Sequence, residues 1–404
     1  MISGCCRGDS PKKHKRIIMK KTIAILGATG SVGTQALDVA RARGYSVDFI
    51  SAGANEVLSE KIAREFNPSY VAMADVRAAE NLRLHLADTN IKVLSGAEGI
   101  TEGIAKSKAE TVVNSILGEA GLLPSLAVIE NKKRLALANK ESLVIAGDIV
   151  MKKAKESGVE IIPVDSEHSA IFQSLKSGNP CEVKRLLLTA SGGPFFGKTR
   201  EELASVTLSD TLSHPTWKMG RKITVDSATL MNKGFEIVEA AHLFGIGSDR
   251  IKVLVHRESI LHSAVEYVDN SVIGELSVPD MRMCVQYAVD YPERCESVSA
   301  ELDLTRLGRL TFAEPDTDAF PLLLLAKRAY LEGGGMCAVM NAADEVAVEA
   351  FLSEKIGFND ISDTVLYTFD KMLSARSALT LSEIISADRA AREAAHEYVS
   401  RIAR

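Results

Sequence analysis

The sequence has few cysteines, no long apolar run and no excess of positive charge, and each absence excludes a class of protein. Its six cysteines show neither paired metal-ligand spacing nor the density of a disulfide framework, which is typical of a reduced, cytoplasmic protein. No apolar run approaches the roughly 20 residues of a membrane span. A net charge of −5 gives no reason to expect nucleic acid as a partner. A length of 404 residues predicts two or three domains.

The N-terminal stretch before the first apolar run is basic and polar. Residues 1–19 lack the long apolar segment of a signal peptide, and we expect a disordered leader without function. A short targeting segment is the alternative, although the stretch is short and poor in serine. Met19 stands just before the first predicted strand and could be the true start of translation.

The first part of the chain, residues 20–164, alternates short β-rich runs with helical periodicity. Helical patterns cover residues 31–43 and 57–66. The runs that read as strands are 21–27, 45–53, 70–74, 92–96, 111–116, 134–139 and 159–165. Alternating strands and helices predict a parallel sheet with helices on both faces. The fold class is therefore α/β, beginning with a Rossmann-like, doubly wound domain.

The pattern changes after residue 164. Residues 165–290 contain runs that suggest a mixed or antiparallel sheet, and we expect a central α+β domain there. Within it, the polar residues 197–220 predict a long loop, and such loops often act as lids. Residues 291–316 read as a linker. Residues 317–404 are nearly all helical in pattern and predict a small helical bundle.

The stretch "TIAILGATGSVG" reads as a strand, a glycine-rich turn and the start of a helix. Gly27, Gly30 and Gly33 form a variant of the dinucleotide fingerprint, in which glycines let the backbone approach a pyrophosphate. The alternative is an ordinary turn between a strand and a helix, but the position at the start of a βαβ pattern favours a nucleotide site. The second strand runs into "SAGANE", without the acid that binds the ribose of NAD, which favours NADP.

The stretch "VDSEHSA" places four polar side chains directly after a buried strand. If the chain stays extended, Asp165 and Glu167 point one way while Ser166 and His168 point the other. Two carboxylates on one face require a cation between them, which a lysine, an arginine or a metal ion would supply. The alternative is that an acid caps the next helix, which explains one carboxylate and not two.

A later stretch, "VDSATLMNKGFEIVEAAHLFG", supplies a further acid. On a helix Asn232 and Glu236 share a face, Lys233 is adjacent, and Ser227 comes before the helix. Alone, Glu236 would read as part of a solvated helix face. Together with the two acids of "VDSEHSA" it makes three hard oxygen ligands of the kind that Mg²⁺ or Mn²⁺ prefers.

Two shorter motifs could bind a ligand. Ser191 stands beside Gly192 and Gly193, which suits a backbone nest for an anion, although an ordinary turn explains it equally well. Lys140 and Glu141 follow a strand of the first domain near the expected nicotinamide, where a lysine is more often solvent-facing.

The expected lid contains aromatic and apolar side chains in a polar setting. Trp217, the single tryptophan, is better explained as a cover over a ligand than as a core residue. His214 and Met219 lie beside it, and His214 alone is weak evidence for a site.

Taken together, these stretches resemble the 1-deoxy-D-xylulose 5-phosphate reductoisomerase family. The motifs "GATGSVG", "LANKESLV", "VDSEHSAIFQ", "SGGPF", "HPTWKMGRKITVDSATLMNKGFE", "VPDMR" and "NAADEVAV" occur in the family's order. The resemblance extends from about residue 20 to the C-terminus. It implies a homodimer that uses NADPH and a divalent metal (Mg²⁺, Mn²⁺ or Co²⁺) to make 2-C-methyl-D-erythritol 4-phosphate in the non-mevalonate isoprenoid route. It also implies inhibition by fosmidomycin.

The resemblance implies a role for each matching residue. The metal ligands would be Asp165, Glu167 and Glu236, which with Lys140 form the catalytic set. The substrate would be bound by Lys140, Ser166, Glu167, Ser191, His214, Trp217, Ser227, Asn232, Lys233 and Glu236. The cofactor would be bound by Thr29, Gly30, Ser31, Val32, Gly53, Asn55, Asn139, Glu141, Met219, Gly220 and Met281. Some relatives have a basic residue where this chain has Ala54, which leaves the strength of 2′-phosphate recognition open.

Two other functions were weighed. A metal-independent semialdehyde or homoserine-type dehydrogenase also begins with such a glycine turn, but the acylating kind needs an activated cysteine, and no cysteine here has that setting. A non-enzymatic NADP-sensing regulator would have no need for three converging carboxylates.

Overall fold

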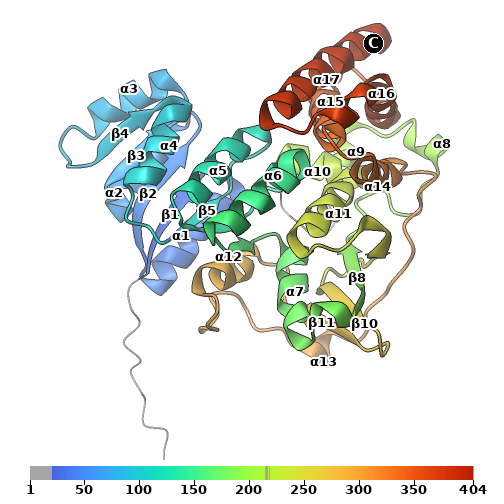
Figure 1. The fold of residues 1–404 in the computed structure, drawn as a ribbon, viewed down its shortest axis with the longest axis horizontal. Coiled ribbons are helices and arrows are strands. Elements are labelled where there is room, and N and C mark those ends of the chain that lie inside the picture. The colour runs from blue at the N-terminus through green and yellow to red at the C-terminus, as the bar shows by residue number, and fades with distance from the viewer. Residues whose placement is uncertain (1–20, 214–216, 218, 404) are drawn as a thin grey trace, which may run out of the picture.

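The computed structural model describes residues 21–213, 217 and 219–403 (Figure 1). The expected leader lies outside these residues. Within them, seven strands form one parallel sheet in the order β4-β3-β2-β1-β5-β6-β7. The strands are β1 (Thr22–Leu26), β2 (Ser46–Ala52), β3 (Tyr70–Met73), β4 (Lys92–Ser95), β5 (Thr111–Asn114), β6 (Arg134–Leu137) and β7 (Ile161–Pro163). All seven predicted strands are confirmed. The strand order reverses between β1 and β5, where open α/β sheets bind their ligands.

Both faces of this sheet are covered, as continuous apolar strands predict. In β1, Ile23 and Ile25 belong to one hydrophobic cluster, while Ala24 and Leu26 belong to the cluster on the opposite face. The helices that follow the strands are α1 (Ser31–Arg43), α2 (Glu56–Phe66), α3 (Val76–His85), α4 (Gly96–Lys106), η1 (Glu119–Gly121), α5 (Leu122–Glu130) and α6 (Glu141–Ser157).

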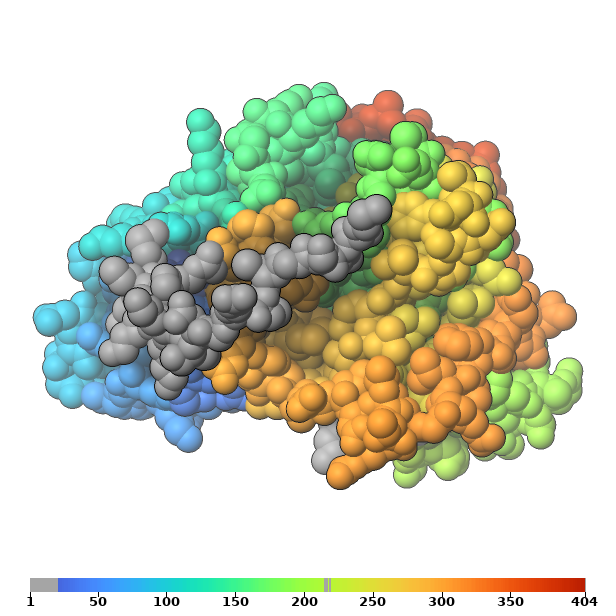
Figure 2. All heavy atoms as spheres, turned by 90° about the horizontal axis from the view of Figure 1, so that it is seen from below, coloured from blue at the N-terminus to red at the C-terminus, as the bar shows by residue number. Residues whose placement is uncertain are grey.

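One helix that covers this sheet comes from much later in the chain. Helix α12 (Met281–Asp290) packs beside α1 and contributes Val285, Ala288 and Val289 to the same cluster. At its end, the hydroxyl of Tyr45 donates a 2.6 Å hydrogen bond to Asp290. Figure 2 shows the orange segment that contains α12 between the blue residues of the first sheet and the yellow residues of the second.

The second sheet is mixed, as expected, with the order β11-β10-β8-β9. Strands β8 and β9 are parallel, and β10 runs antiparallel to both β8 and β11. The strands are β8 (Val183–Ala190), β9 (Ile251–Val255), β10 (Leu261–Tyr267) and β11 (Val272–Leu276). The accompanying helices are α7 (Ser166–Ser174), η2 (Leu175–Ser177), η3 (Pro180–Glu182), α10 (Arg221–Ala228), α11 (Met231–Phe244) and η4 (Ser248–Arg250).

The polar segment expected to be a long loop contains two one-turn helices in its described part. They are α8 (Arg200–Leu203) and α9 (Leu208–Thr211). Each begins with a capping box, in which a threonine and an acid three residues later satisfy each other's backbone amides. These local caps explain why a segment with little apolar periodicity still forms helical turns.

After α12 the chain is mostly without regular structure up to residue 321 and is then helical, as predicted. The elements of this part are α13 (Leu304–Leu307), α14 (Leu322–Glu332), α15 (Met336–Leu352), α16 (Phe358–Lys371), η5 (Leu373–Ser377) and α17 (Leu381–Ile402). Helix α15 is buried on nearly all sides because it packs against α14, α16 and α17 and also against α6 and α10 (Figure 1). The bundle therefore packs against helices of both earlier regions.

Candidate active site

The glycine-rich turn after β1 has the geometry of a pyrophosphate loop. Gly27 has φ +78°, and a Cβ there would lie 2.8 Å from the carbonyl oxygen of Ser115. A Cβ on Gly33 would lie only 2.1 Å from the carbonyl oxygen of Gly27, so both positions require glycine. Gly30 precedes α1, and no side chain caps the helix there or places an acid in its first turn. The amides at this N-terminus are therefore suited to an anion.

The other residues expected to bind the cofactor lie around this turn or farther along the sheet edge. Thr29, Ser31 and Val32 belong to the turn and the start of α1. Val32 and Met281 pack against the same hydrophobic cluster, and their helices α1 and α12 pack side by side. Three further residues lie at helix starts: Gly53 and Asn55 before α2, where Asn55 is the N-cap, and Gly220 before α10, with Met219 just upstream.

Asn139 has a buried amide that holds two loops together. Its Nδ2 donates to the carbonyl oxygens of Ile116 at 2.7 Å and Gly118 at 2.9 Å, and to a carboxylate oxygen of Glu141 at 2.9 Å. Its Oδ1 accepts from the amide of Ser142. Burial raises the pKa of Glu141. These contacts fix the loop after β5 against the loop after β6, at the carboxyl edge of the sheet.

The segment "VDSEH" does not stay extended, and that part of the prediction was wrong. Helix α7 begins at Ser166, with Asp165 at its N-cap position. The Asp165 side chain makes no capping hydrogen bond, so capping does not explain this acid. Asp165 and Glu167 nevertheless converge, because one precedes the helix and the other lies in its first turn. Carboxylate oxygens of Asp165, Glu167 and Glu236 lie within 4.8 Å of one another.

Three chain segments bring these groups together. Strands β6 and β7 are neighbours, so Lys140 after β6 and Asp165 after β7 leave the sheet at the same edge. Helix α11 packs across α6 and contacts α7, which places Glu236 against both. We call Asp165, Glu167 and Glu236 the carboxylate cluster.

Two buried lysines neutralise part of the carboxylate cluster. The Nζ of Lys140 lies 3.0 Å from Oδ2 of Asp165 and 3.5 Å from Oε1 of Glu236. The Nζ of Lys233 donates to Oε1 of Glu167 at 2.7 Å and also pairs with Glu236. Lys233 is 4% exposed and Glu236 is 1% exposed. Two ammonium groups therefore supply part of the positive charge that the acids of "VDSEHSA" require.

The pKa shifts in the cluster follow from burial and from these ion pairs. Burial lowers the pKa of Lys140, but Asp165 and Glu236 outweigh it and raise that pKa well above its usual value. Burial raises the pKa of Asp165, but Lys140, His168 and further partners together outweigh burial and lower that pKa. For Glu236, burial and the charge of Glu167 raise the pKa to about 7. Three carboxylates converge beside two ammonium groups, and a divalent cation bound among them would lower the pKa of Glu236 by favouring its charged form.

A histidine and a fourth acid lie beside the carboxylate cluster. The Nε2 of His168 lies 2.9 Å from the backbone oxygen of Glu236, and its Nδ1 lies 3.1 Å from Oε2 of Glu239. Burial lowers the pKa of His168, but Glu239 outweighs it and raises that pKa to about 9. Sequence reasoning missed Glu239. Its position three residues after Glu236, on the same face of α11, was the available signal.

The residues expected to hold the substrate lie on turns beside the cluster. Gly192 and Gly193 have φ +76° and +64°, and a Cβ on Gly193 would lie 2.7 Å from the backbone oxygen of Ser227. The turn that begins with Ser191 therefore touches the backbone of α10 at Ser227. Arg257 donates hydrogen bonds to the carbonyl oxygens of Ser191 at 3.1 Å and Gly193 at 2.5 Å. Sequence reasoning missed Arg257, which no local pattern singles out.

Polar side chains at the start of α11 and α7 bond to the carboxylates and to Lys140. Asn232 accepts from Lys140 at 2.6 Å and donates to Oε1 of Glu236 at 2.5 Å. The hydroxyl of Ser166 donates to Glu167 at 2.5 Å. Leu230, the residue before α11, has φ +59°, which is uncommon for a non-glycine residue and often marks a functional site.

The expected lid is described only in part. The ring of Trp217 lies 6.2 Å from the ring of His262 on β10, tilted by 59°. His214 lies outside the described residues.

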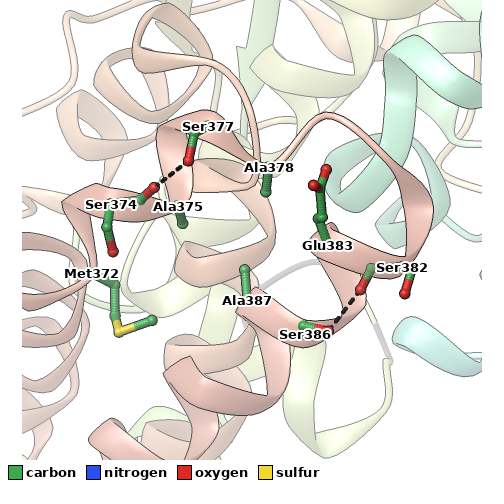
Figure 3. Close-up of a pocket in the computed structure, with 9 residues that line it drawn as sticks. All are labelled: Met372, Ser374, Ala375, Ser377, Ala378, Ser382, Glu383, Ser386 and Ala387. Carbon is green, nitrogen blue, oxygen red and sulfur yellow. Dashed lines mark hydrogen bonds between the residues drawn. The ribbon is translucent and has the colours of Figure 1, made fainter.

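A surface hollow of about 360 Å³ lies elsewhere, between η5 and the start of α17. Figure 3 shows that the hydroxyls of Ser377 and Ser386 bond to backbone oxygens of their own helices, Ser374 and Ser382. Glu383, the one carboxylate in the lining, accepts from the backbone amide of Thr380 and so caps α17. Polar groups committed to their own helices do not form a reactive site.

A dinucleotide-binding sheet beside a converging set of three carboxylates defines a metal-dependent, nicotinamide-dependent oxidoreductase. Comparison with known proteins identifies the family. Its models match in three parts: 1-deoxy-D-xylulose 5-phosphate reductoisomerase over residues 23–147, its C-terminal domain over 161–244, and a DXP reductoisomerase C-terminal domain over 276–394. The chain belongs to the 1-deoxy-D-xylulose 5-phosphate reductoisomerase family.

Named relatives agree over nearly the whole chain. The reductoisomerase of Caldanaerobacter subterraneus subsp. tengcongensis is 52% identical over 379 residues, which are 93% of this chain and 98% of the relative. That of Acetivibrio thermocellus is 50% identical over 384 residues, which are 94% of this chain and 100% of the relative.

Solved structures of the family share the fold. A DOX-P reductoisomerase in complex with NADPH, fosmidomycin and magnesium has a TM-score of 0.88 and 39% identity, covering 94% of this chain and 98% of that one. The Zymomonas mobilis enzyme in complex with NADPH has a TM-score of 0.87 and 39% identity, covering 94% and 99%. The expected family and fold class are confirmed.

Proposed function

We propose that this chain uses NADPH and a divalent metal to convert 1-deoxy-D-xylulose 5-phosphate to 2-C-methyl-D-erythritol 4-phosphate, in the non-mevalonate route to isoprenoids. The observation that carries the proposal is the convergence of the carboxylate cluster, within 4.8 Å, at the edge of a dinucleotide-binding sheet. Relatives with this fold hold NADPH, fosmidomycin and magnesium. A metal-independent dehydrogenase and a sensing regulator are not favoured, since neither explains a buried set of three acids.

Asp165, Glu167 and Glu236 are the residues that hold the metal. Three carboxylate oxygens in one place form the hard donor set that suits Mg²⁺, and Mn²⁺ and Co²⁺ accept the same ligands. A divalent ion bound there supplies a Lewis acid for the ketone and neighbouring hydroxyl of the substrate. Lys140 and Lys233 orient the carboxylates, Lys140 favours the ionised form of Asp165, and Asn232 fixes Glu236 through its 2.5 Å hydrogen bond.

The substrate phosphate binds between the Ser191 turn and the start of α11. The contact between Gly193 and the backbone of Ser227 brings the glycine turn against the end of α10, and Asn232 and Lys233 lie in the first turn of the next helix, α11. Ser166 and Lys140 reach the substrate backbone from the side of the first sheet. The expected lid carries His214 and Trp217, and Trp217 covers the bound substrate to exclude water.

NADPH lies along the carboxyl edge of the first sheet. Its pyrophosphate binds the turn of Thr29, Gly30, Ser31 and Val32, whose helix amides lack a side-chain cap. Its adenosine lies against Gly53 and Asn55. The nicotinamide, which supplies the hydride, lies toward Met219, Gly220 and Met281 and the segment that contains Asn139 and Glu141. α12 carries Met281 from the later part of the chain to the glycine turn.

The enzyme acts as a cytoplasmic homodimer in this proposal. Strand β11 is the edge of the second sheet, and its Val272, Ile273 and Leu276 are exposed. An exposed apolar edge strand favours pairing with a second copy. The six cysteines lack a disulfide framework, which supports a cytoplasmic location. None of the described helices is both long enough and apolar enough to cross a bilayer.

The direct test is NADPH oxidation on addition of 1-deoxy-D-xylulose 5-phosphate, with Mg²⁺ or Mn²⁺ and then with excess EDTA. We expect oxidation with either metal, loss of it with EDTA, and inhibition by fosmidomycin. Oxidation that persists in EDTA would refute the metal-dependent mechanism. No oxidation under any of these conditions would refute the assigned reaction.

A further inference from the structure

A surface hollow of about 350 Å³ lies at the carboxyl ends of β2 and β3. It is lined by Ala54, Asn55, Glu56, Val57, Asp75, Arg77, Ala78 and Asn81. The two loops that form it are tied to each other, because the amide of Asp75 donates to the carbonyl of Gly53 at 3.2 Å and that of Ala74 donates to Ala52 at 2.9 Å. The hollow is therefore shared by the starts of α2 and α3.

This hollow adjoins the pyrophosphate turn. The amide of Ala28 donates to the carbonyl of Ser51 at 2.8 Å, and that of Gly27 donates to the hydroxyl of Ser51 at 3.3 Å. Since β1 and β2 are neighbours, the loop after β2 is the next one along the sheet edge. In dinucleotide-binding sheets the end of the second strand faces the adenosine ribose, which carries the phosphate that distinguishes NADPH from NADH.

The charges of the hollow are unequally committed. Glu56 accepts a 2.9 Å hydrogen bond from Asn81, and Asp75 accepts a 2.7 Å bond from the amide of Ala78 at the start of α3. Asn55 accepts from the amide of Leu58 and caps α2. Arg77 is exposed and has no hydrogen bond or ion pair within the described ranges 21–213, 217 and 219–403. Of the lining side chains, it is the one that carries a positive charge.

We propose that Arg77 binds the 2′-phosphate of NADPH and supplies from α3 the charge that the loop after β2 lacks at Ala54. A guanidinium offers paired donors that match a phosphate, and its positive charge attracts the phosphate dianion. The two acids of the lining keep their charges but are held by Asn81 and by the start of α3, and neither forms an ion pair with Arg77 among the described residues. This inference rests on the proposed use of NADPH and assigns the residue that selects it over NADH.

The test measures binding of NADPH and NADH to the enzyme without substrate, by titration calorimetry, in wild type, Arg77→Met and Arg77→Lys. Hydrogen bonds to a charged group predict a rise of about 10-fold to 100-fold in the Kd of NADPH for Arg77→Met, with the Kd of NADH unchanged. Arg77→Lys should retain part of the affinity. Competition by 2′,5′-ADP should weaken in Arg77→Met, while competition by 5′-AMP should not.

Arg83→Met is the matched control, since Arg83 is an exposed arginine of the same helix that does not line the hollow. It should leave both affinities unchanged. If wild type prefers NADPH and Arg77→Met keeps that preference, the Arg77 assignment is wrong while the proposed function stands. Equal loss of NADPH and NADH binding would also overturn it. If wild type binds neither nucleotide, the proposed function fails as well.

Discussion

The carboxylate cluster and a second buried group of acids differ in how their charge is balanced. In the second group, Lys222 donates to Asp226 at 2.7 Å and to Asp344 at 3.0 Å. We call these three residues the Lys222 cluster. Both of its acids are buried, and burial raises the pKa of Asp226 and of Asp344. In both regions carboxylates outnumber lysines, so an excess of buried acid does not by itself indicate a metal site.

Geometry separates the two regions. In the Lys222 cluster one ammonium group stands between two acids and joins α10 to α15, which makes a closed bridge between helices. In the carboxylate cluster, oxygens of three acids converge within 4.8 Å, and each of the two lysines, Lys140 before α6 and Lys233 on α11, pairs with Glu236 and one other acid. We therefore expect the Lys222 cluster to need its lysine for the stability of the fold, and the carboxylate cluster to need a further cation for activity. The predictions below test that difference.

The largest effect is expected from Glu167→Gln. Removal of one ligand charge should lower metal affinity by at least about 100-fold, since even outer partners of metal ligands contribute 10-fold to 100-fold. Turnover should nearly disappear, while NADPH binding should be unchanged. Calorimetric titration with Mn²⁺ and with NADPH measures the two affinities separately. Glu349→Gln, an exposed acid on α15, is the control. A parallel loss of NADPH binding would show that Glu167 is not a metal ligand.

Lys222→Met should act on stability instead. It leaves two buried acids without their cation, and breaking a buried ion pair in this way costs about 3–5 kcal/mol, less if an acid becomes protonated. Urea unfolding followed by circular dichroism should show the loss, and Mn²⁺ affinity should remain within a few-fold of wild type. The exposed Lys152→Met is the control. A large loss of Mn²⁺ affinity with normal stability would mean that the two regions are not distinct.

Arg257→Met should weaken the turn that begins with Ser191 and leave metal binding unchanged. The guanidinium donates to the carbonyls of Ser191 and Gly193, so its loss should loosen the turn and raise the KM for substrate about tenfold. We expect kcat and Mn²⁺ affinity to change little. The exposed Arg306→Met is the control. A fall in kcat at constant KM would contradict a role in positioning the turn.

The sequence predicted those parts of the molecule that depend on local patterns. All seven strands of the first sheet were found, because burial on both faces makes most of them short apolar runs. The acids of the carboxylate cluster were found through their motifs. The start of α7 was missed, because the seven residues of "VDSEHSA" fit both a continuing strand and a capped helix.

Other features depend on contacts between distant segments, which no local pattern records. Lys222 and Asp226 read as an ordinary surface pair four residues apart, and their partner Asp344 lies 122 residues beyond Lys222. In the same way, Arg77 lies on α3 and Ala54 in the loop after β2, and only the sheet order places the two together. Pairing of loops and helices in space decides both cases.

The smallest effect concerns an ion pair at the surface of the second sheet. Hydrogen bonds from Arg185 and Lys184 lower the pKa of Glu266 to about 2. Because the folded-state pKa is depressed, the stabilisation is present above the ordinary value near 4.5 and is lost as pH falls toward 2. Both cationic partners are well exposed, so the pair is worth only about 0.2–1 kcal/mol.

Glu266→Gln should therefore shift the urea midpoint slightly at pH 7, and this difference from wild type should shrink progressively below pH 4.5. Glu258→Gln offers a comparison. Among the described residues, Glu258 accepts a 2.7 Å hydrogen bond from the hydroxyl of Thr311 and has no lysine or arginine partner, although His256 lies 3.1 Å away. Added salt should reduce the Glu266 effect more than the Glu258 effect, because salt screens an exposed ion pair more than a neutral hydrogen-bond donor. A Glu266 effect as large as that of Lys222→Met would mean that burial is not what separates strong from weak charge pairs in this protein.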